Sequence, residues 1–136
     1  MSTVRADAVT GMIRVLLIDD DDDVRALVET MIGVDGRFHL VASTDSATEG
    51  IRLAAWHQPD AVVLDLHIPG VDGLQALPVI RQVFGGVVVV FSAFPDPFTL
   101  LDVTERGADA YVDKARAWSE LLPAVAAACE AVRERR

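Results

Sequence analysis

Residues 61–73 read Ala-Val-Val-Leu-Asp-Leu-His-Ile-Pro-Gly-Val-Asp-Gly, an apolar run that stops at one carboxylate and then enters a loop rich in proline and glycine. The run has the length and the β-branched content of a buried parallel strand, and the loop residues are typical of a break in secondary structure. Asp65 is therefore predicted at the carboxyl end of a central strand, where open α/β sheets bind their ligands. A carboxylate in that place is a candidate nucleophile, a candidate metal ligand or both.

Helical patterns separate this strand from four other segments that have strand composition. The other strands are predicted at 13–18, 38–42, 87–91 and 110–112, and apolar residues at helical spacing predict helices near 24–32, 47–55, 76–84, 97–106 and 119–132. Strands that alternate with helices pair in parallel through right-handed crossovers. The expected fold is α/β: a doubly wound, five-stranded parallel sheet of order 2-1-3-4-5 with helices on both faces, as in flavodoxin-like proteins.

Some helix ends are marked by individual residues. Gly33 and Gly36 are predicted to end the first helix. Either Asp45 or Ser46 is predicted to cap the second, and Ser46 with Glu49 has the spacing of a capping box. Pro78 is expected near the first turn of the third helix, where a missing N–H group is tolerated. Asp21, Asp22 and Asp23 are expected to cap the first helix and to interact favourably with the positive end of its dipole.

Length and composition restrict the class of protein. The chain has 136 residues, of which 51% are hydrophobic, and we expect one domain at 13–136 after a flexible N-terminal tail at 1–12. A net charge of −9 argues against direct contact of this domain with nucleic acid. The single Cys129 fits a reducing compartment, and no apolar run is long enough for a membrane span, so a cytoplasmic protein is expected.

Polar residues follow four of the five predicted strands, and the carboxyl ends of parallel strands lie on one rim of the sheet. Asp19 and Asp20 follow the first strand, Asp65 the third, Ser92 the fourth and Lys114 the fifth. Three carboxylates in one pocket repel each other, and a hard divalent cation such as Mg²⁺ relieves that repulsion. A hydroxyl and an ammonium group suit the oxygens of a phosphoryl group. The chemistry indicated is phosphoryl transfer to Asp65, forming an acyl phosphate.

These motifs, in this order and spacing, resemble the response-regulator receiver family of two-component signalling, also called the CheY-like family. The resemblance covers about residues 13–133 and is carried by Asp19-Asp20, by Asp65 in its loop motif, by Ser92-Ala93 and by Tyr111-Val112-Asp113-Lys114. It implies that Asp65 accepts a phosphoryl group from a sensor histidine kinase or a phosphotransfer protein. Such a domain catalyses only its own phosphorylation and dephosphorylation.

The resemblance also implies a ligand set for the cation. Asp20 and Asp65 would bind Mg²⁺ directly, Asp19 would bind it through water, and the main-chain carbonyl of His67 would supply a further ligand. Mn²⁺ is an alternative occupant. The side chain of His67 is not expected to be a metal ligand, although it and Phe94 are placed to influence the access of water to the acyl phosphate.

Further roles implied by the family concern the phosphoryl group and its readout. Ser92 and Lys114 would contact the phosphoryl oxygens. Tyr111 would move with Ser92 and report phosphorylation on the face made by the fourth helix, the fifth strand and the fifth helix. That face would meet a downstream output domain or protein, or a second copy of the chain. Ala115 replaces the proline usual after the lysine, as in receivers attached to helix-turn-helix domains. The sequence is compatible both with a stand-alone receiver and with part of a longer regulator.

Two other functions fit parts of this pattern. An aspartyl-phosphate phosphohydrolase of haloacid-dehalogenase type would carry a second aspartate two residues after the nucleophile, but His67 occupies that position. A receiver-like interaction module that is never phosphorylated is the other alternative, although no essential residue is missing. Trp56, Trp118 and Cys129 are interpreted as packing residues, and both tryptophans are expected on helices away from the rim.

Overall fold

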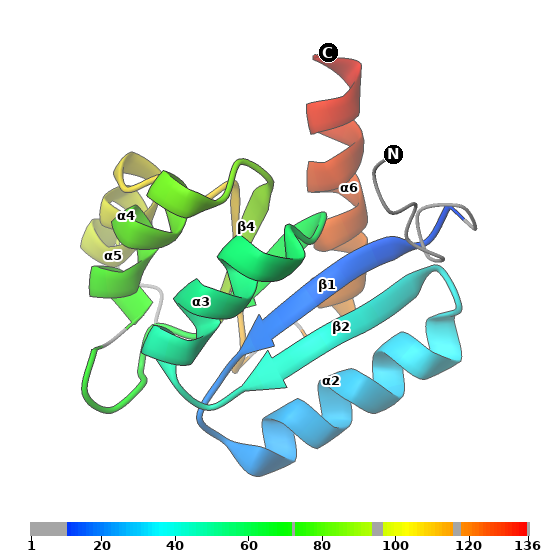
Figure 1. Cartoon of the computed structure of the whole chain (residues 1–136), viewed down its shortest axis with the longest axis horizontal. Helices are drawn as coiled ribbons and strands as arrows, with labels where there is room; N and C mark the ends of the chain where they lie inside the picture. The colour runs from blue at the N-terminus through cyan, green and yellow to red at the C-terminus, as the bar shows by residue number, and fades with distance from the viewer. Residues whose placement is uncertain (1–10, 72, 94–96, 116–117, 136) are drawn as a thin grey trace.

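The computed structural model describes residues 11–71, 73–93, 97–115 and 118–135, so most of the expected tail and Phe94 lie outside the described residues. Five strands form one parallel sheet of order β2-β1-β3-β4-β5: β1 (Ile13–Ile18), β2 (Phe38–Thr44), β3 (Ala61–Leu64), β4 (Val87–Ser92) and β5 (Ala110–Asp113). The helices are α2 (Asp22–Asp35), α3 (Ala47–His57), α4 (Gly73–Val83), α5 (Pro97–Glu105), the 3₁₀-helix η1 (Trp118–Glu120) and α6 (Leu121–Glu134) (Figure 1). The predicted fold is confirmed.

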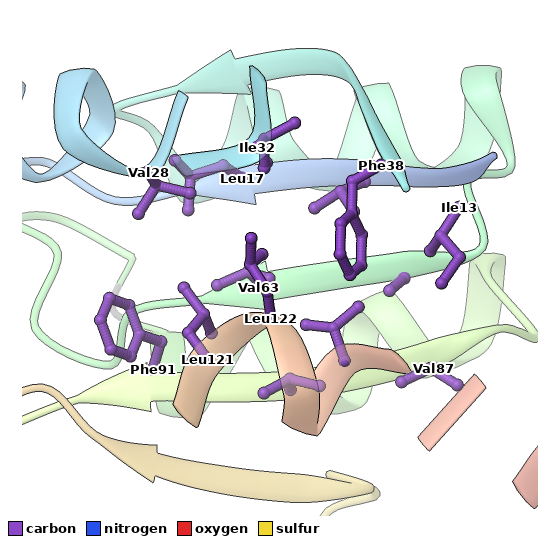
Figure 2. Close-up of a cluster of buried hydrophobic side chains, with 14 of the residues drawn as sticks. Ile13, Leu17, Val28, Ile32, Phe38, Val63, Val87, Phe91, Leu121 and Leu122 are labelled. Atoms are coloured by element: carbon purple, nitrogen blue, oxygen red, sulfur yellow. The ribbon is translucent and has the colours of Figure 1, made fainter. Parts of the chain in front are cut away.

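Alternation along the strands divides the core into two layers. Val15 and Leu17 of β1 pack with buried residues of α2 and α6, whereas Leu16 and Ile18 pack with buried residues of α3, α4 and α5. Figure 2 shows the first layer, in which Val28 and Ile32 of α2 lie near Leu17 of β1, while Leu121 and Leu122 of α6 lie near Val63 of β3. The central strand β3 is wholly apolar, and β4 is apolar up to Ser92, because both faces of the sheet are covered there.

The ends of α2 and α3 test the predicted caps. The prediction that Gly33 ends the first helix is wrong, because α2 continues through it to Asp35. Gly36 ends the helix, with φ +80° and its N–H group donating to the carbonyl of Ile32, which is the left-handed cap that glycine favours. Of the two predicted caps for α3, Ser46 is the one used, since its hydroxyl accepts a hydrogen bond from the N–H group of Glu49 at 3.2 Å.

Pro78 is not in the first turn of its helix. The helix α4 begins at Gly73, so Pro78 lies in the interior and cannot bond the carbonyl of Leu74, four residues earlier. Arg106, just after α5, donates from Nη1 to that carbonyl at 3.3 Å and pairs through Nε with Asp102 at 2.7 Å. A long-range side-chain contact thus satisfies the group that proline leaves without its helical partner.

Both tryptophans differ from expectation. The side chain of Trp56 on α3 is 77% exposed and therefore contributes little packing. Trp118 is half-buried and packs edge-on against Phe91, with the ring centroids 4.8 Å apart. Since Phe91 directly precedes Ser92, Trp118 lies close to the rim rather than away from it.

Among the described helices, none combines the length and the apolar character needed to cross a membrane.

Candidate functional site

Strand register places two acidic strand ends side by side. Ile18, the last residue of β1, pairs with Leu64 of β3, and the N–H group of Asp65 donates to the carbonyl of Ile18 at 2.9 Å. The next residues along the two strands are therefore Asp19 and Asp65, and both are buried. One carboxylate oxygen from each of Asp19, Asp20 and Asp65 lies within 4.8 Å of the others. The predicted convergence of the three carboxylates is confirmed.

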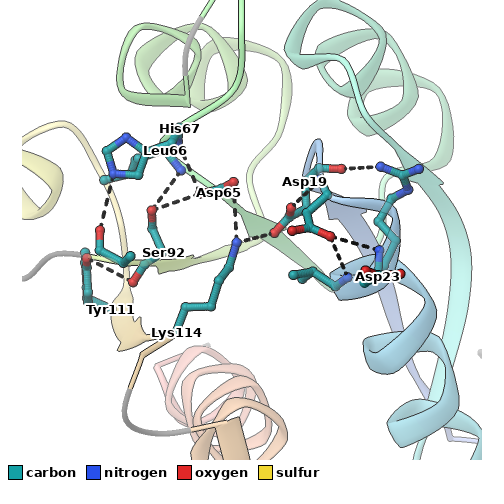
Figure 3. Close-up of polar contacts among 12 residues, drawn as sticks. Asp19, Asp23, Asp65, Leu66, His67, Ser92, Tyr111 and Lys114 are labelled. Atoms are coloured by element: carbon teal, nitrogen blue, oxygen red, sulfur yellow. Dashed lines mark hydrogen bonds and ion pairs between the residues drawn. The ribbon is translucent and has the colours of Figure 1, made fainter.

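Lys114 supplies the positive charge of this pocket. Its main-chain N–H group donates to the carbonyl of Ser92 at 3.0 Å, which fixes the end of β5 against the end of β4. Its Nζ atom lies 2.7 Å from Oδ2 of Asp19 and 3.4 Å from Oδ2 of Asp65 (Figure 3). Burial raises the pKa of the Asp19 carboxyl above its usual value, while the hydrogen bond from Lys114 acts in the opposite direction. The ammonium group thus partly offsets the charge of two buried carboxylates.

Hydrogen bonds orient the carboxylate of Asp65. Its Oδ1 atom accepts from the hydroxyl of Ser92 at 2.8 Å and from the N–H group of His67 at 3.1 Å. The N–H group of Leu66 donates to the same hydroxyl oxygen at 3.4 Å. With Oδ1 held in this way, Oδ2 is the oxygen that faces Lys114 (Figure 3). The two oxygens of the carboxylate therefore have different surroundings.

Gly73 allows α4 to begin directly against Asp65. Its N–H group donates to the carbonyl of Leu66 at 3.1 Å. A Cβ atom at this position would overlap the carbonyl oxygen of Asp65 and would lie 2.7 Å from the Cα atom of Leu66. The glycine at the end of the loop 66–73 is therefore required by the close approach of two backbone segments.

Two side chains connect the site with its surroundings. The hydroxyl of the half-buried Tyr111 donates to the carbonyl of Ser92 at 3.2 Å, the same oxygen that accepts from the N–H group of Lys114. The ring nitrogen Nε2 of His67 lies 3.3 Å from the carbonyl oxygen of Ala93, which links the loops after β3 and β4. Tyr111 is thus placed where movement of Ser92 would reach β5.

The start of α2 adds features that the sequence revealed only in part. Asp21 is the N-cap and accepts from the N–H groups of Asp23 and Val24, which confirms an ordinary capping role within the acidic run. Arg25 donates from Nη1 to the main-chain carbonyl of Asp19 at 2.7 Å and pairs with Asp22, three residues earlier. Arg25 was not predicted from the sequence: the i, i+3 spacing with Asp22 is a local signal for the ion pair, but no local signal indicates the contact with Asp19.

The donor set of the pocket suits a hard cation. It consists of carboxylate oxygens from Asp19, Asp20 and Asp65, without cysteine or histidine among the ligand atoms of the described residues. Oxygen ligands of this kind favour Mg²⁺, Mn²⁺ and Ca²⁺ over softer metals. Asp20 is exposed, so the pocket is open to solvent on one side. The acidic triad could therefore bind a divalent metal.

A 2-1-3-4-5 parallel sheet with an acidic triad, a hydroxyl and a lysine at its carboxyl edge defines the class of α/β signalling domains that carry phosphate on aspartate. Residues 15–126 match the response regulator receiver domain family. The chain belongs to this family, and it is a signalling domain rather than a turnover enzyme; the phosphohydrolase alternative is not supported.

Relatives and solved structures agree with this assignment. The chain is 33% identical over 118 residues to the transcriptional regulatory protein LiaR of Bacillus subtilis, covering 86% of this chain and 56% of that protein. It is 36% identical over 112 residues to the nitrate/nitrite response regulator protein NarL of Escherichia coli, covering 82% and 52%. A two-component response regulator of the LuxR family from Aurantimonas superposes with a TM-score of 0.83 at 32% identity, covering 88% of this chain and 86% of that one. The chain spans about half the length of the curated relatives it matches.

Proposed function

We propose that Asp65 accepts a phosphoryl group from the phosphohistidine of a sensor histidine kinase or a phosphotransfer protein. A carboxylate oxygen of Asp65 forms a bond to phosphorus while the P–N bond of the phosphohistidine breaks, and the imidazole leaves with the electron pair and takes up a proton. The observation that carries the proposal is the orientation of Asp65 by Ser92 and His67 through Oδ1, with Lys114 opposite Oδ2. The carboxylate is thus held in one orientation, beside an ammonium group that can interact with the oxygens of an incoming phosphoryl group.

Ser92 and Lys114 are proposed to contact the phosphoryl oxygens after transfer. Both already point at Asp65, one through its hydroxyl at 2.8 Å and the other through its ammonium at 3.4 Å. The phosphoryl group brings about −1.5 to −2 charges, and an ammonium group stabilises this charge in a buried site. To make that contact, Lys114 must exchange part of its interaction with Asp19 for one with the phosphoryl group.

The cation of this reaction is proposed to be Mg²⁺, with Mn²⁺ as an alternative. Asp20 and Asp65 would hold it directly, Asp19 would hold it through water, and the main-chain carbonyl of His67 would add a ligand. When bound, the cation supplies positive charge beside the transferred phosphoryl oxygens. The protein groups contribute the fixed orientation of the ligands, including the contact of Arg25 with the main chain of Asp19.

The signal is proposed to leave the site through Ser92 and Tyr111. The Tyr111 hydroxyl bonds the Ser92 carbonyl at 3.2 Å, so a shift of Ser92 toward a phosphoryl group changes the partner of Tyr111 on β5. The affected face is made by α5, β5 and α6. Its partner is a downstream output domain or protein, or a second copy of the chain. We take 13–136 as the receiver domain and the cytoplasm as its compartment.

The proposal is tested by labelling the full chain with a small phosphodonor such as acetyl phosphate in MgCl₂ and measuring the added mass. Asp65→Asn should abolish labelling, because the amide is not a nucleophile of this kind. Asp23→Asn is the matched control, since Asp23 lies on the exposed start of α2 and should leave labelling unchanged. Equal labelling of Asp65→Asn and the unaltered chain would refute the assignment.

A further inference from the structure

Phe91, in β4, lies between Lys114 of the site and Trp118 of the 3₁₀-helix η1. The Nζ atom of Lys114 is 5.6 Å from the centroid of the Phe91 ring. The same ring also packs against the ring of Trp118 in a T-shaped arrangement, with the ring centroids 4.8 Å apart and the ring planes at 89°. Phe91 is fully buried, whereas Trp118 is half-buried at the start of η1. One ring therefore touches both the pocket and the segment that leads into α6.

The position of Lys114 depends on more than its carboxylate partners. A lysine side chain has a flexible four-carbon stem, and its ammonium forms point-charge contacts that fix direction poorly. An aromatic ring within about 6 Å attracts an ammonium group, and the attraction is larger where solvent is excluded. The side chain of Lys114 is 17% exposed, so solvent is largely excluded from this contact. The ring is thus placed to limit where the ammonium group can lie.

Trp118 in turn limits where the ring can lie. Edge-to-face aromatic pairs have a preferred geometry and contribute beyond their buried area. Phe91 also belongs to the core layer formed with α2 and α6, against which Trp118 packs. The phenylalanine is consequently held by the core and by Trp118, while Lys114 is held by the ring and by the two carboxylates.

We propose that Phe91, braced by Trp118, is a positioning residue that holds the ammonium group of Lys114 over the pocket. This inference rests on the proposed function, in which Lys114 contacts the transferred phosphoryl group. It adds a route from the pocket to the start of α6 that does not pass through Tyr111. A change in the position of Lys114 when the pocket fills is expected to alter the surroundings of Trp118.

The positioning role is tested by the rate of Asp65 labelling by acetyl phosphate in four full-length chains: unaltered, Phe91→Leu, Lys114→Met and the double variant. Phe91→Leu should slow labelling by about 3- to 10-fold, the range expected for loss of a largely desolvated cation–π contact. In the Lys114→Met background the same substitution should have no further effect, because no ammonium group remains to be positioned. An equal slowing in both backgrounds would show a merely structural role and would overturn the proposal.

A second pair of variants avoids the buried core. Trp118→Phe keeps an aromatic ring and should label within about twofold of the unaltered chain, whereas Trp118→Leu should approach the rate of Phe91→Leu. Labelling of both Trp118 variants and Phe91→Leu at the unaltered rate overturns the inference and leaves the proposed function standing. Absence of labelling in the unaltered chain overturns the proposed function and this inference with it.

Fluorescence provides a readout that rate measurements do not. In Trp56→Phe the remaining tryptophan is Trp118, and its emission should change when beryllofluoride and MgCl₂ are added. In Trp118→Phe the remaining tryptophan is the exposed Trp56, and its emission should stay constant. A change in both variants, or in neither, contradicts the proposed route from Lys114 to Trp118.

Discussion

The Nη1 atom of Arg106 lies 3.3 Å from the main-chain carbonyl oxygen of Leu74 and donates a hydrogen bond to it. That carbonyl would accept from residue 78 in a regular helix, but residue 78 is proline. The contact joins the first turn of α4, which begins against Asp65, to the end of α5. The two helices are thus connected by a hydrogen bond that exists because one helical hydrogen bond is missing.

Pro78→Ala is expected to stabilise the protein and to make Arg106 less important. Alanine restores the helical N–H group, and the net gain should be about 2 kcal/mol after the larger entropy of the unfolded chain is subtracted. Arg106→Met should cost about 1 kcal/mol in the unaltered chain and clearly less in Pro78→Ala. Urea unfolding of the four chains measures the coupling, and strictly additive effects would contradict it.

Gly73→Ala is expected to damage both stability and the site. The added methyl group would overlap the main chain at Asp65 and Leu66, so the free energy of unfolding should fall by about 2–3 kcal/mol. Labelling of Asp65 should slow as well, because its peptide must shift. Gly85→Ala is the matched control: its Cβ atom would meet nothing within 4 Å. A Gly73→Ala variant as stable as Gly85→Ala would show that the backbone contact is not tight.

Gly33→Ala is expected to stabilise α2. Gly33 lies within the helix and a Cβ atom there has open space, so the gain should be about 0.5–1 kcal/mol. Gly36→Ala should have the opposite sign, since its φ of +80° disfavours a side chain by about 1 kcal/mol. Thermal unfolding of the two variants distinguishes them, and a loss of stability in Gly33→Ala would place the end of α2 earlier than Asp35.

Millimolar MgCl₂ is expected to raise the melting temperature. The three carboxylates of the pocket repel each other, and a ligand that binds only the folded chain at ten times its Kd adds about 1.4 kcal/mol. Asp20→Asn should remove most of the shift, whereas Asp23→Asn should retain it. NaCl of equal ionic strength controls for screening. The absence of a shift in the unaltered chain, or an equal shift in Asp20→Asn, would count against a metal site at Asp20.

The sequence was sufficient to predict the sheet and the rim of the site. Strands covered on both faces are mostly apolar, as β3 and β4 are, so they stand out from amphipathic helices. The parallel order of the strands then determines which strand ends are neighbours. Asp19, Asp65, Ser92 and Lys114 could be placed together because each lies at or just after the carboxyl end of a predicted strand. This prediction required no knowledge of side-chain packing.

The details that were missed depend on contacts between distant segments. Nothing local in the sequence shows that Trp118 meets Phe91, or that Arg106 reaches Leu74. The end predicted at Gly33 is wrong because glycine is a frequent helix end, and two glycines lie close together here. α2 continues only to Asp35, and it is Gly36 that adopts the left-handed cap and donates its N–H group to the carbonyl of Ile32.

Fewer buried side chains hold α5 against the sheet than hold α4. Among its described side chains only Val103 is buried, whereas Phe98 is 82% and Leu101 59% exposed. Burial of one valine contributes about 1.5–3 kcal/mol, well below the 5–15 kcal/mol that typically separates a folded domain from its unfolded chain. Opening of α5 alone therefore costs far less than global unfolding, and its amide hydrogens should exchange with solvent long before those of α4. The face proposed for signal output therefore includes a helix that is expected to detach from the sheet at low cost, while the strands that hold Asp65 stay folded.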